Sequence, residues 1–220
     1  MKNLILASAL ILAMRVAAQE GAVPADQEPL RKVELKNDCV EVMHVTIPAG
    51  QSSQWHRHSH DAIVVGLSDA AARIDVQGQN AASFALHPGD VSARPYANQP
   101  VTHRVNNVGK TPFETLEIEL LKRPEGPAAD PATAPAAENA SLRAYQWALD
   151  PGHSTPQHTH VRPYLIIAAT PMQLLMKAPD GASMEHPIRA GDFHWIDAQV
   201  THTLTNTGKE SGTIIEVELK

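Results

Sequence analysis

The chain of 220 residues has few of the residue types that support several common kinds of chemistry. It contains one cysteine, Cys39, so no intrachain disulfide can form. Cys39 stands in an apolar run, and we expect a small buried side chain rather than a nucleophile. Aromatic residues make up only 4% of the chain. Aliphatic side chains must therefore build most of the core, which the 43% of hydrophobic residues allows.

The sequence also lacks an excess of basic charge and a long internal apolar run. The formal net charge is −6, which argues against a nucleic acid as partner. No basic amphipathic segment suits a membrane surface. We find no Gly-x-Ser-x-Gly elbow, no phosphate-binding glycine loop and no dinucleotide fingerprint. We therefore expect a small-molecule ligand or substrate, and neither nucleic acid nor a membrane as partner.

Residues 1–18 have the pattern of a secretory signal peptide. Lys2 gives a positive start, and the apolar run 4–14 is too short to span a bilayer. The small residues Val16-Ala17-Ala18 form a cleavage site before Gln19. The pattern predicts a periplasmic or secreted protein.

Histidine is abundant, with 12 residues, and its pattern is written twice. His56-Arg57-His58 recurs as His158-Thr159-His160, a shift of 102 residues (158 − 56). Further on, Val101-Thr102-His103 recurs as Val200-Thr201-His202, a shift of 99 (202 − 103). The same two shifts align Gly50 with Gly152 and Glu117 with Glu216, among others. A constant shift over most of the chain predicts two equivalent structural units.

A Pro/Ala-rich stretch separates the two repeats. We assign residues 19–29 as a flexible N-terminal tail, 30–122 as repeat 1, 123–140 as a linker and 141–220 as repeat 2. Within each repeat, short β-favouring runs alternate with Gly, Pro, Asn and Asp turns, which indicates an all-β sandwich or small barrel. The run 214–219 alternates apolar and acidic residues, as a half-buried strand does.

The spacing of the histidines indicates metal binding. Residues i and i+2 of a strand share one face, so the two histidines of each His-x-His project together. A third histidine from a distant strand completes a set that leaves positions open for water or substrate. Neutral imidazole suits zinc, iron, copper and nickel. The predicted metal ligands are His56, His58 and His103 in repeat 1, and His158, His160 and His202 in repeat 2.

These motifs resemble the two sequence motifs of the cupin superfamily. The first is Gly50, His56 and His58, followed by Gly89, Pro95, His103 and Asn107. The second is Gly152, His158 and His160, followed by Gly191, His202 and Asn206. The resemblance implies an all-β bicupin, in which two tandem cupin-type β-barrels (double-stranded β-helix or jelly roll) are joined by the Pro/Ala-rich linker. The superfamily hosts many reactions and binding proteins, so the reaction has to be argued from the site.

The chain departs from the family pattern in one respect. Many metal-binding cupins carry a glutamate three or four residues after the second histidine, where this chain has Ala62 and Ile63, and Tyr164 and Leu165. The sequence therefore predicts three-histidine sites, of the type that the thiol and diketone dioxygenases of the superfamily have. It puts chemistry like that of oxalate decarboxylase in doubt.

The residue two positions beyond each His-x-His differs between the repeats. His60 is a candidate extra metal ligand in repeat 1, with an exposed loop imidazole as the alternative. Arg162 in repeat 2 offers a donor fork for a carboxylate, with an outward surface position as the alternative. The candidate catalytic residues are Tyr164, Arg162 and Tyr96.

Two functions remain open from the sequence. The first is an exported metalloenzyme of the dioxygenase type that acts on a small organic acid, a thiol or a diketone. Its cofactor would be a divalent metal ion, with Fe(II) favoured over Zn, Ni, Mn or Cu. The second is a module that binds a small molecule or a sugar without turnover. Two barrels in one chain suit a monomer, and a homodimer stays open.

Overall fold

The computed structural model describes residues 21–126, 133–197 and 199–220. The predicted signal peptide, residues 1–18, lies outside the described residues. No helix among the described residues is long and apolar enough to span a membrane.

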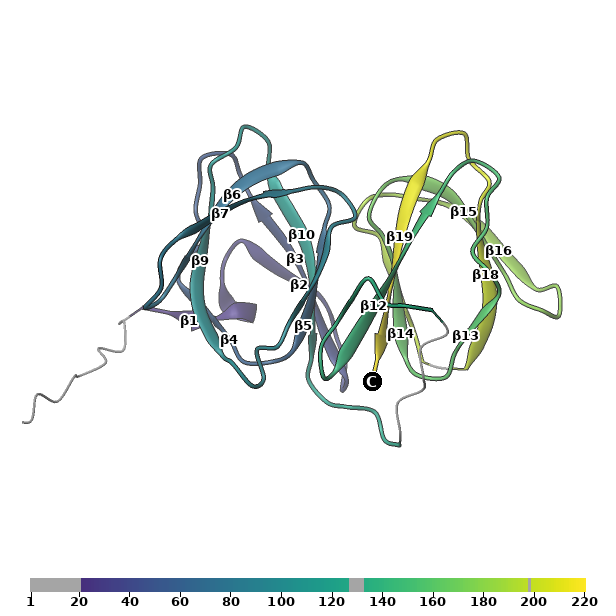
Figure 1. Cartoon of the computed structure of the whole chain (residues 1–220), viewed down its shortest axis with the longest axis horizontal. Coiled ribbons are helices and arrows are strands. Elements are labelled where there is room, and N and C mark those ends of the chain that lie inside the picture. Colours follow the sequence, from purple (N-terminus) through teal and green to yellow (C-terminus); the bar gives the residue numbers. More distant parts are fainter. Residues whose placement is uncertain (1–20, 127–132, 198) are drawn as a thin grey trace, which may run out of the picture.

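The described chain is built almost wholly of short strands, which form two β-barrels side by side (Figure 1). Each barrel closes two sheets on each other, as the all-β prediction requires. In the first barrel the sheets have the orders β1-β4-β9-β6-β7 and β2-β3-β10-β5-β8. In the second the orders are β11-β12-β19-β14-β17 and β13-β18-β15-β16. The fold is therefore two tandem cupin-type barrels.

The first barrel contains β1 (Val23–Pro24), the 3₁₀ turn η1 (Ala25–Gln27), β2 (Arg31–Lys36), β3 (Val40–Ile47), β4 (His56–His58), β5 (Ala62–Gly66), β6 (Ala70–Val76), β7 (Ala82–Leu86), β8 (Val91–Arg94), β9 (Val101–Asn107) and β10 (Phe113–Leu120). The second contains β11 (Ala137–Glu138), β12 (Leu142–Leu149), β13 (His158–His160), β14 (Tyr164–Ala168), β15 (Met172–Lys177), β16 (Ser183–Ile188), β17 (Phe193–Ile196), β18 (Val200–Asn206) and β19 (Gly212–Leu219). β11 begins inside the range predicted as a linker, of which residues 127–132 lie outside the described part.

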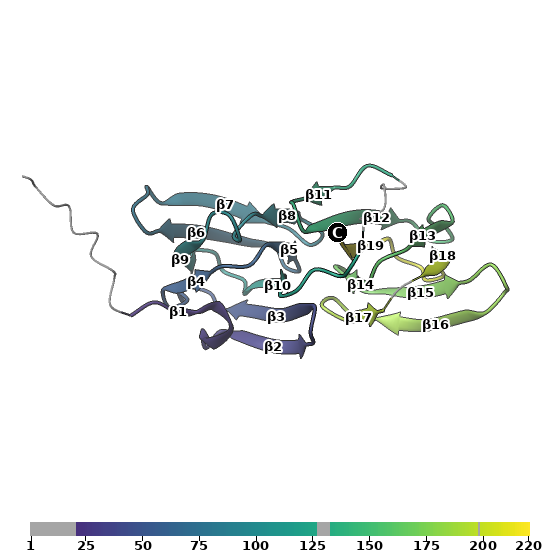
Figure 2. The same cartoon turned by 90° about the horizontal axis from the view of Figure 1, so that it is seen from below.

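The largest apolar core lies between the barrels. The sheet containing β10 and β5 faces the sheet containing β12, β19 and β14, as Figures 1 and 2 both show. Buried aliphatic side chains from both sheets form one cluster, which includes Leu116, Ile118, Leu165, Ile215 and Val217. Each barrel has a second, smaller cluster in its interior. Burial of apolar area is the main driving force for such packing.

Two equivalent glycine turns pack closely against the opposite barrel, one from each side. Gly89 has φ of +90°, and a Cβ at this position would lie 3.1 Å from a methyl carbon of Thr213 in the other barrel. Gly191 has φ of +87°, and its Cβ would lie 3.3 Å from the ring of His44 in the first barrel. Glycine is required at both positions by the left-handed backbone and by the close approach.

The N-terminal segment differs from the flexible tail that the sequence predicts over residues 19–29. From Val23 onward it lies against the first barrel, with β1 paired in parallel with β4. Ala25 and Glu28 are buried. The Glu28 carboxylate accepts the backbone N–H groups of Leu30 (2.9 Å) and Gln54 (3.0 Å), so a buried acid anchors the segment. The polar composition of residues 19–29 gave no indication that Glu28 is buried.

Candidate metal centre

Strand pairing brings the predicted histidines together in each barrel. His56 on β4 lies directly opposite His103 on β9, and His158 on β13 lies opposite His202 on β18. The second histidine of each His-x-His shares the inward face, as the alternation of a strand requires. The nitrogen atoms of each triad lie within 4.8 Å of one another. The predicted clustering of His56, His58 and His103, and of His158, His160 and His202, is therefore seen in the structure.

The outer ring nitrogens are held in the same way in both barrels. His56 Nδ1 donates to the carbonyl of Gln54 (2.8 Å), and His158 Nδ1 donates to that of Pro156 (2.9 Å). A ring that donates from Nδ1 presents the lone pair of Nε2 to the barrel interior. Carbonyl and carboxylate partners of this kind are what orient histidines that bind metals.

Carboxylates on the last strand of each barrel supply the same support to the second histidine. His58 Nδ1 donates to Glu119 (2.8 Å), and His160 Nδ1 donates to Glu218 (2.9 Å). Glu119 and Glu218 are both buried.

The expectation of a site built from three histidines alone does not hold in the second barrel, where Glu216 joins the histidines. Glu117 on β10 and Glu216 on β19 both project into the barrel interior and are buried, with Glu216 0% exposed. The alternating pattern of 214–219 predicts a half-buried strand, in which one face commonly meets water. Its apolar residues instead face the core between the barrels, so its acids face the interior of the barrel. The acidic pair repeated at a shift of 99 in both copies was the signal for this arrangement.

In the second barrel, the Glu216 carboxylate contacts all three histidines. Its oxygen atoms lie 2.9 Å from His158 Nε2, 3.3 Å from His160 Nε2 and 3.1 Å from His202 Nε2. The Nε2 atoms of His158 and His202 are 3.0 Å apart. Donor atoms that surround one ion at about 2.1 Å lie about 3.0–3.4 Å from each other. The four residues of this set therefore fit a single divalent ion.

Charges in the second barrel also favour a cation. Burial raises the pKa of Glu216, but hydrogen bonds to the three imidazoles outweigh this effect and hold that pKa well below its usual range. Burial lowers the pKa of His160, but Glu216 and Glu218 outweigh it and raise that pKa to about 9. The pKa of His158 is raised in the same way by Glu216. Protons on the histidines thus balance a buried carboxylate, and a metal ion would replace them.

The indole of Trp147 completes this site. Trp147 Nε1 donates to Glu216 Oε2 over 2.6 Å, and its ring lies 5.5 Å from that of His158. Trp147 lies outside the histidine motifs, so no motif predicts this position for it. A hydrogen bond of this kind fixes the orientation of a ligating carboxylate.

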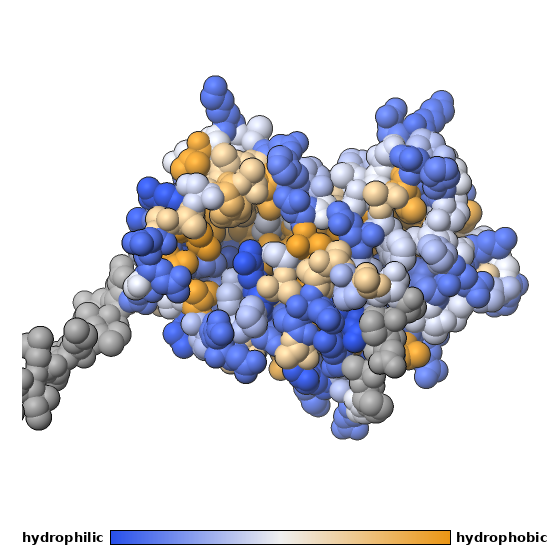
Figure 3. Space-filling model, in the orientation of Figure 1, coloured by the Kyte–Doolittle hydropathy of each residue, from blue (hydrophilic) through white to orange (hydrophobic). Residues whose placement is uncertain are grey.

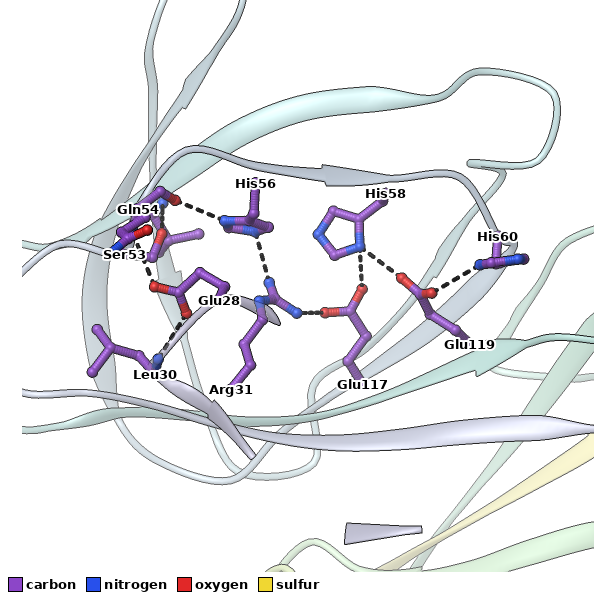
Figure 4. Close-up of polar contacts among 11 residues, drawn as sticks. Glu28, Leu30, Arg31, Ser53, Gln54, His56, His58, His60, Glu117 and Glu119 are labelled. Atoms are coloured by element: carbon purple, nitrogen blue, oxygen red, sulfur yellow. Dashed lines mark hydrogen bonds and ion pairs between the residues drawn. The ribbon is translucent and has the colours of Figure 1, made fainter. Parts of the chain in front are cut away.

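In the first barrel, Arg31 enters the equivalent space (Figure 4). Its Nη2 donates to His56 Nε2 over 2.9 Å, and its Nη1 forms an ion pair with Glu117. Both side chains of the pair are about 95% buried. Burial raises the pKa of Glu117, but Arg31 outweighs this effect and lowers that pKa to about 2. Arg31 was not predicted, because it lies outside the histidine motifs.

Strand β2 places Arg31 in the interior of the first barrel. Arg31 pairs with Val45 across β2 and β3, and Val45 faces the interior cluster. In the second barrel the residue equivalent to Val45 is Trp147, at the shift of 102 (147 − 45). There the outer strand β11 has only the residues Ala137 and Glu138, which pair with Ala144 and Arg143 and do not reach Trp147.

The donors of the first barrel do not fit a metal ion while Arg31 is in place. The lone pair of His56 Nε2 and an oxygen of Glu117 are engaged by the guanidinium. Burial, followed by the charge of Arg31, lowers the pKa of His56 to about 3. Burial lowers that of His103 to about 2. The Glu117 carboxylate is therefore already paired with a fixed cation, the guanidinium of Arg31.

Other predicted site residues lie in different places. His60 is about half exposed and contacts Glu119 at 3.2 Å, away from the three-histidine cluster. Arg162 donates to the carbonyl of Glu125, at the segment that connects the barrels. His60 thus matches the alternative of an exposed loop imidazole, whereas Arg162 is buried and lies neither at a carboxylate nor on the outer surface.

The two predicted tyrosines do line the sites. The ring of Tyr164 stacks on His160 at 3.8 Å, and its buried hydroxyl has no hydrogen-bond partner among the described residues. Tyr96 stacks on His58 at 4.8 Å. Burial raises the pKa of both phenols, so both hold their protons at neutral pH.

Comparison with known proteins supports the fold. No family model matches the chain. The β-alanine degradation protein BauB of Pseudomonas aeruginosa is 29% identical over 83 residues, which cover 38% of this chain and 86% of that protein. Among solved structures, AerE of Microcystis aeruginosa matches with a TM-score of 0.58 and 13% identity, over 88% of this chain and 98% of that one.

Oxalate decarboxylase of Bacillus subtilis, which contains Mn(II) centres, matches with a TM-score of 0.55 and 12% identity. The match covers 83% of this chain and 69% of that enzyme. At such low identities these structures establish the cupin fold alone. The chemistry has to be inferred from the residues of the site.

Proposed function

We propose that the protein is a metal-dependent bicupin enzyme whose single metal ion is held in the second barrel by His158, His160, His202 and Glu216. The contact of one buried carboxylate with all three Nε2 atoms carries this proposal. A set of three imidazoles and one carboxylate suits Fe(II) or Mn(II). We favour Fe(II).

The substrate class that suits this site is a small organic acid. A bound metal ion would polarise a coordinated carboxylate or carbonyl and provide open positions for substrate and O₂. Because Glu216 joins the three histidines, a small organic acid is favoured over the thiols and diketones that a site of three histidines alone suggests. A relative named for the degradation of β-alanine, a small amino acid, supports the same class.

Tyr164 is placed to donate a hydrogen bond in this chemistry. Its hydroxyl is buried, lies beside the metal ligands and has no partner among the described residues. The raised pKa keeps the phenol protonated, so it donates a hydrogen bond to a coordinated substrate. A hydrogen bond to a charged group contributes about 1.5–3 kcal/mol, so Tyr164→Phe should lower kcat roughly 10–150-fold.

Reconstitution tests the proposal. Metal-free protein is loaded separately with Fe(II), Mn(II) and Zn(II), and O₂ uptake and CO₂ release are followed with a panel of small carboxylic acids. We expect turnover with Fe(II) or Mn(II), its loss in His158→Ala, and its retention in the matched variant His56→Ala. A non-catalytic binding module is the alternative, and metal-loaded protein that binds these acids without turnover would establish it.

Export belongs to the same proposal. The positive start, short apolar run and small residues at 16–18 support cleavage before Gln19. Sequencing of the mature N-terminus from the periplasm or medium should begin at Gln19. The apolar core shared by the barrels supports a monomer.

A further inference from the structure

A second cavity lies in the first barrel, apart from the proposed metal centre. It measures about 250 Å³. Its polar end is made by Arg31, Glu117, His103 and Tyr96. Its walls are largely apolar, with aliphatic residues and two phenylalanines, and they include Val45, Ile47, Leu86, Val105, Phe84 and Phe113.

The cavity reaches the surface. Phe84, 38% exposed, lines it and packs edge-on against Phe113 with ring centroids 6.1 Å apart. Figure 3 shows apolar residues gathered around a hollow on the upper part of the first barrel. A concave apolar site with a few polar groups at one end is the usual form of a small-molecule site.

The lining carries no net charge. Arg31 is balanced by Glu117, and the remaining charged residues of the lining are one arginine, Arg94, and one aspartate, Asp90. A ligand with a net charge would enter this space uncompensated, at a large desolvation cost.

The polar end nevertheless has unused hydrogen-bonding groups. Arg31 Nε and His103 Nε2 are buried and have no partner among the described residues. A buried donor or acceptor without a partner is costly, and a ligand oxygen or hydroxyl would satisfy one.

We infer that the first barrel is a metal-free binding site for a small, uncharged and largely apolar molecule with one hydroxyl or carbonyl group, in which Arg31 takes the place of the metal. The inference goes beyond the proposed function, because it concerns the other barrel and needs no metal. The neutral head group binds beside Arg31 and His103, and the apolar body lies between Val105 and Phe113.

Three probes of similar size and different charge test this: benzyl alcohol, benzoate and benzylammonium. Their binding to metal-stripped full-length protein is measured by calorimetry and by shifts of the histidine ring signals. We expect benzyl alcohol to bind at least tenfold more tightly than either ion, with the same Kd after metal is restored. Equal or tighter binding of an ion, a requirement for metal, or no binding of benzyl alcohol at millimolar concentration would overturn the inference.

Substitutions at equivalent positions locate the binding. Val105→Phe fills the cavity of the first barrel and should abolish the binding of benzyl alcohol. Leu204→Phe, its counterpart at the shift of 99 (204 − 105), should leave it unchanged. The reverse pattern would place the site in the second barrel. If either variant fails to fold, ring shifts at His103 rather than His202 in the wild type decide the same question.

Arg31→Ala tests the displacement of the metal. It frees His56 and Glu117, so metal bound per chain should rise from about one to about two, whereas Arg73→Ala on the outer surface should stay at one. Two metal ions in the wild type would refute the inference, and of the proposed function they would leave only the metal ion of the second barrel. A wild type that binds no metal would refute the proposed function alone, because the probe experiment uses stripped protein.

Discussion

Glu117 and Glu216 occupy equivalent positions on the last strands of the two barrels, yet their carboxylates contact different partners. Glu117 is paired with the guanidinium of Arg31, whereas Glu216 lies among three imidazoles and the indole N–H of Trp147. The first arrangement is a completed ion pair. The second directs several ligand atoms at one point and would accept a cation without the displacement of a side chain.

The carboxylates behind the ligands should matter in one barrel only. Glu218→Gln removes the charged acceptor of His160 Nδ1 and should weaken metal binding about 10–100-fold. The matched variant Glu119→Gln changes the equivalent contact of His58 and should leave metal affinity unchanged. Titration with a competing chelator measures both. Equal effects of the two variants would mean that both barrels bind metal.

Loss of Arg31 should destabilise the metal-free protein. Removing one partner of a buried pair leaves Glu117 uncompensated and costs about 3–5 kcal/mol. Arg31→Ala should therefore lower the free energy of unfolding by about that amount in chelator, and added metal should restore part of it. Arg73→Ala, on an exposed surface, should stay within about 0.5 kcal/mol. Urea unfolding with and without metal provides the comparison.

The two barrels should respond to pH in opposite directions when metal is absent. The lowered pKa values of His56 and His103 mean that the unfolded chain binds more protons below about pH 6.5, so their contribution to stability is lost as pH falls. His160, with its pKa raised to about 9, contributes stability below about pH 6.5 that is lost as pH rises through 9.

Nitrogen-15 spectra of the histidine rings check this directly. His56 and His103 should be neutral at about pH 5, and His160 should still be charged at about pH 8. Added metal should remove the proton from His160 and leave His56 unchanged. A charged His56 at about pH 5 would contradict the buried contact with Arg31.

The shared core should couple the barrels. Ile118 is fully buried between them, and Ile118→Ala should cost about 2–5 kcal/mol. Signals from Trp55 in the first barrel and Trp195 in the second should then still unfold together. Val108→Ala, 60% exposed, serves as the control. Separate transitions for the two signals would show that the barrels are independent.

The fold and the six histidines could be predicted because the sequence repeats them at constant shifts. The alternation of strands then places each triad on one face. The carboxylates could not be placed by the same rule, because alternation in β19 does not say which face meets water. The β19 strand separates two interiors: Ile215 and Val217 face the other barrel, and Glu216 faces the metal centre.

Arg31 could not be found from any motif. Its position depends on strand β2, which begins directly after residues 19–29, and on Glu28, which anchors that segment. His60 and Arg162 show the limit of the strand alternation. Both continue the parity of His-x-His in the sequence, but the chain turns between β4 and β5 and between β13 and β14, so parity does not carry over.

Metal content of paired variants tests the central claim most directly. Protein without a chelating tag is reconstituted with Fe(II) under anaerobic conditions, passed through a desalting column and analysed by mass spectrometry of the metal. We expect about one ion per chain in the wild type and in His56→Ala, and less than about a tenth in His158→Ala. Loss of metal in His56→Ala with retention in His158→Ala would contradict the assignment of the metal centre to the second barrel.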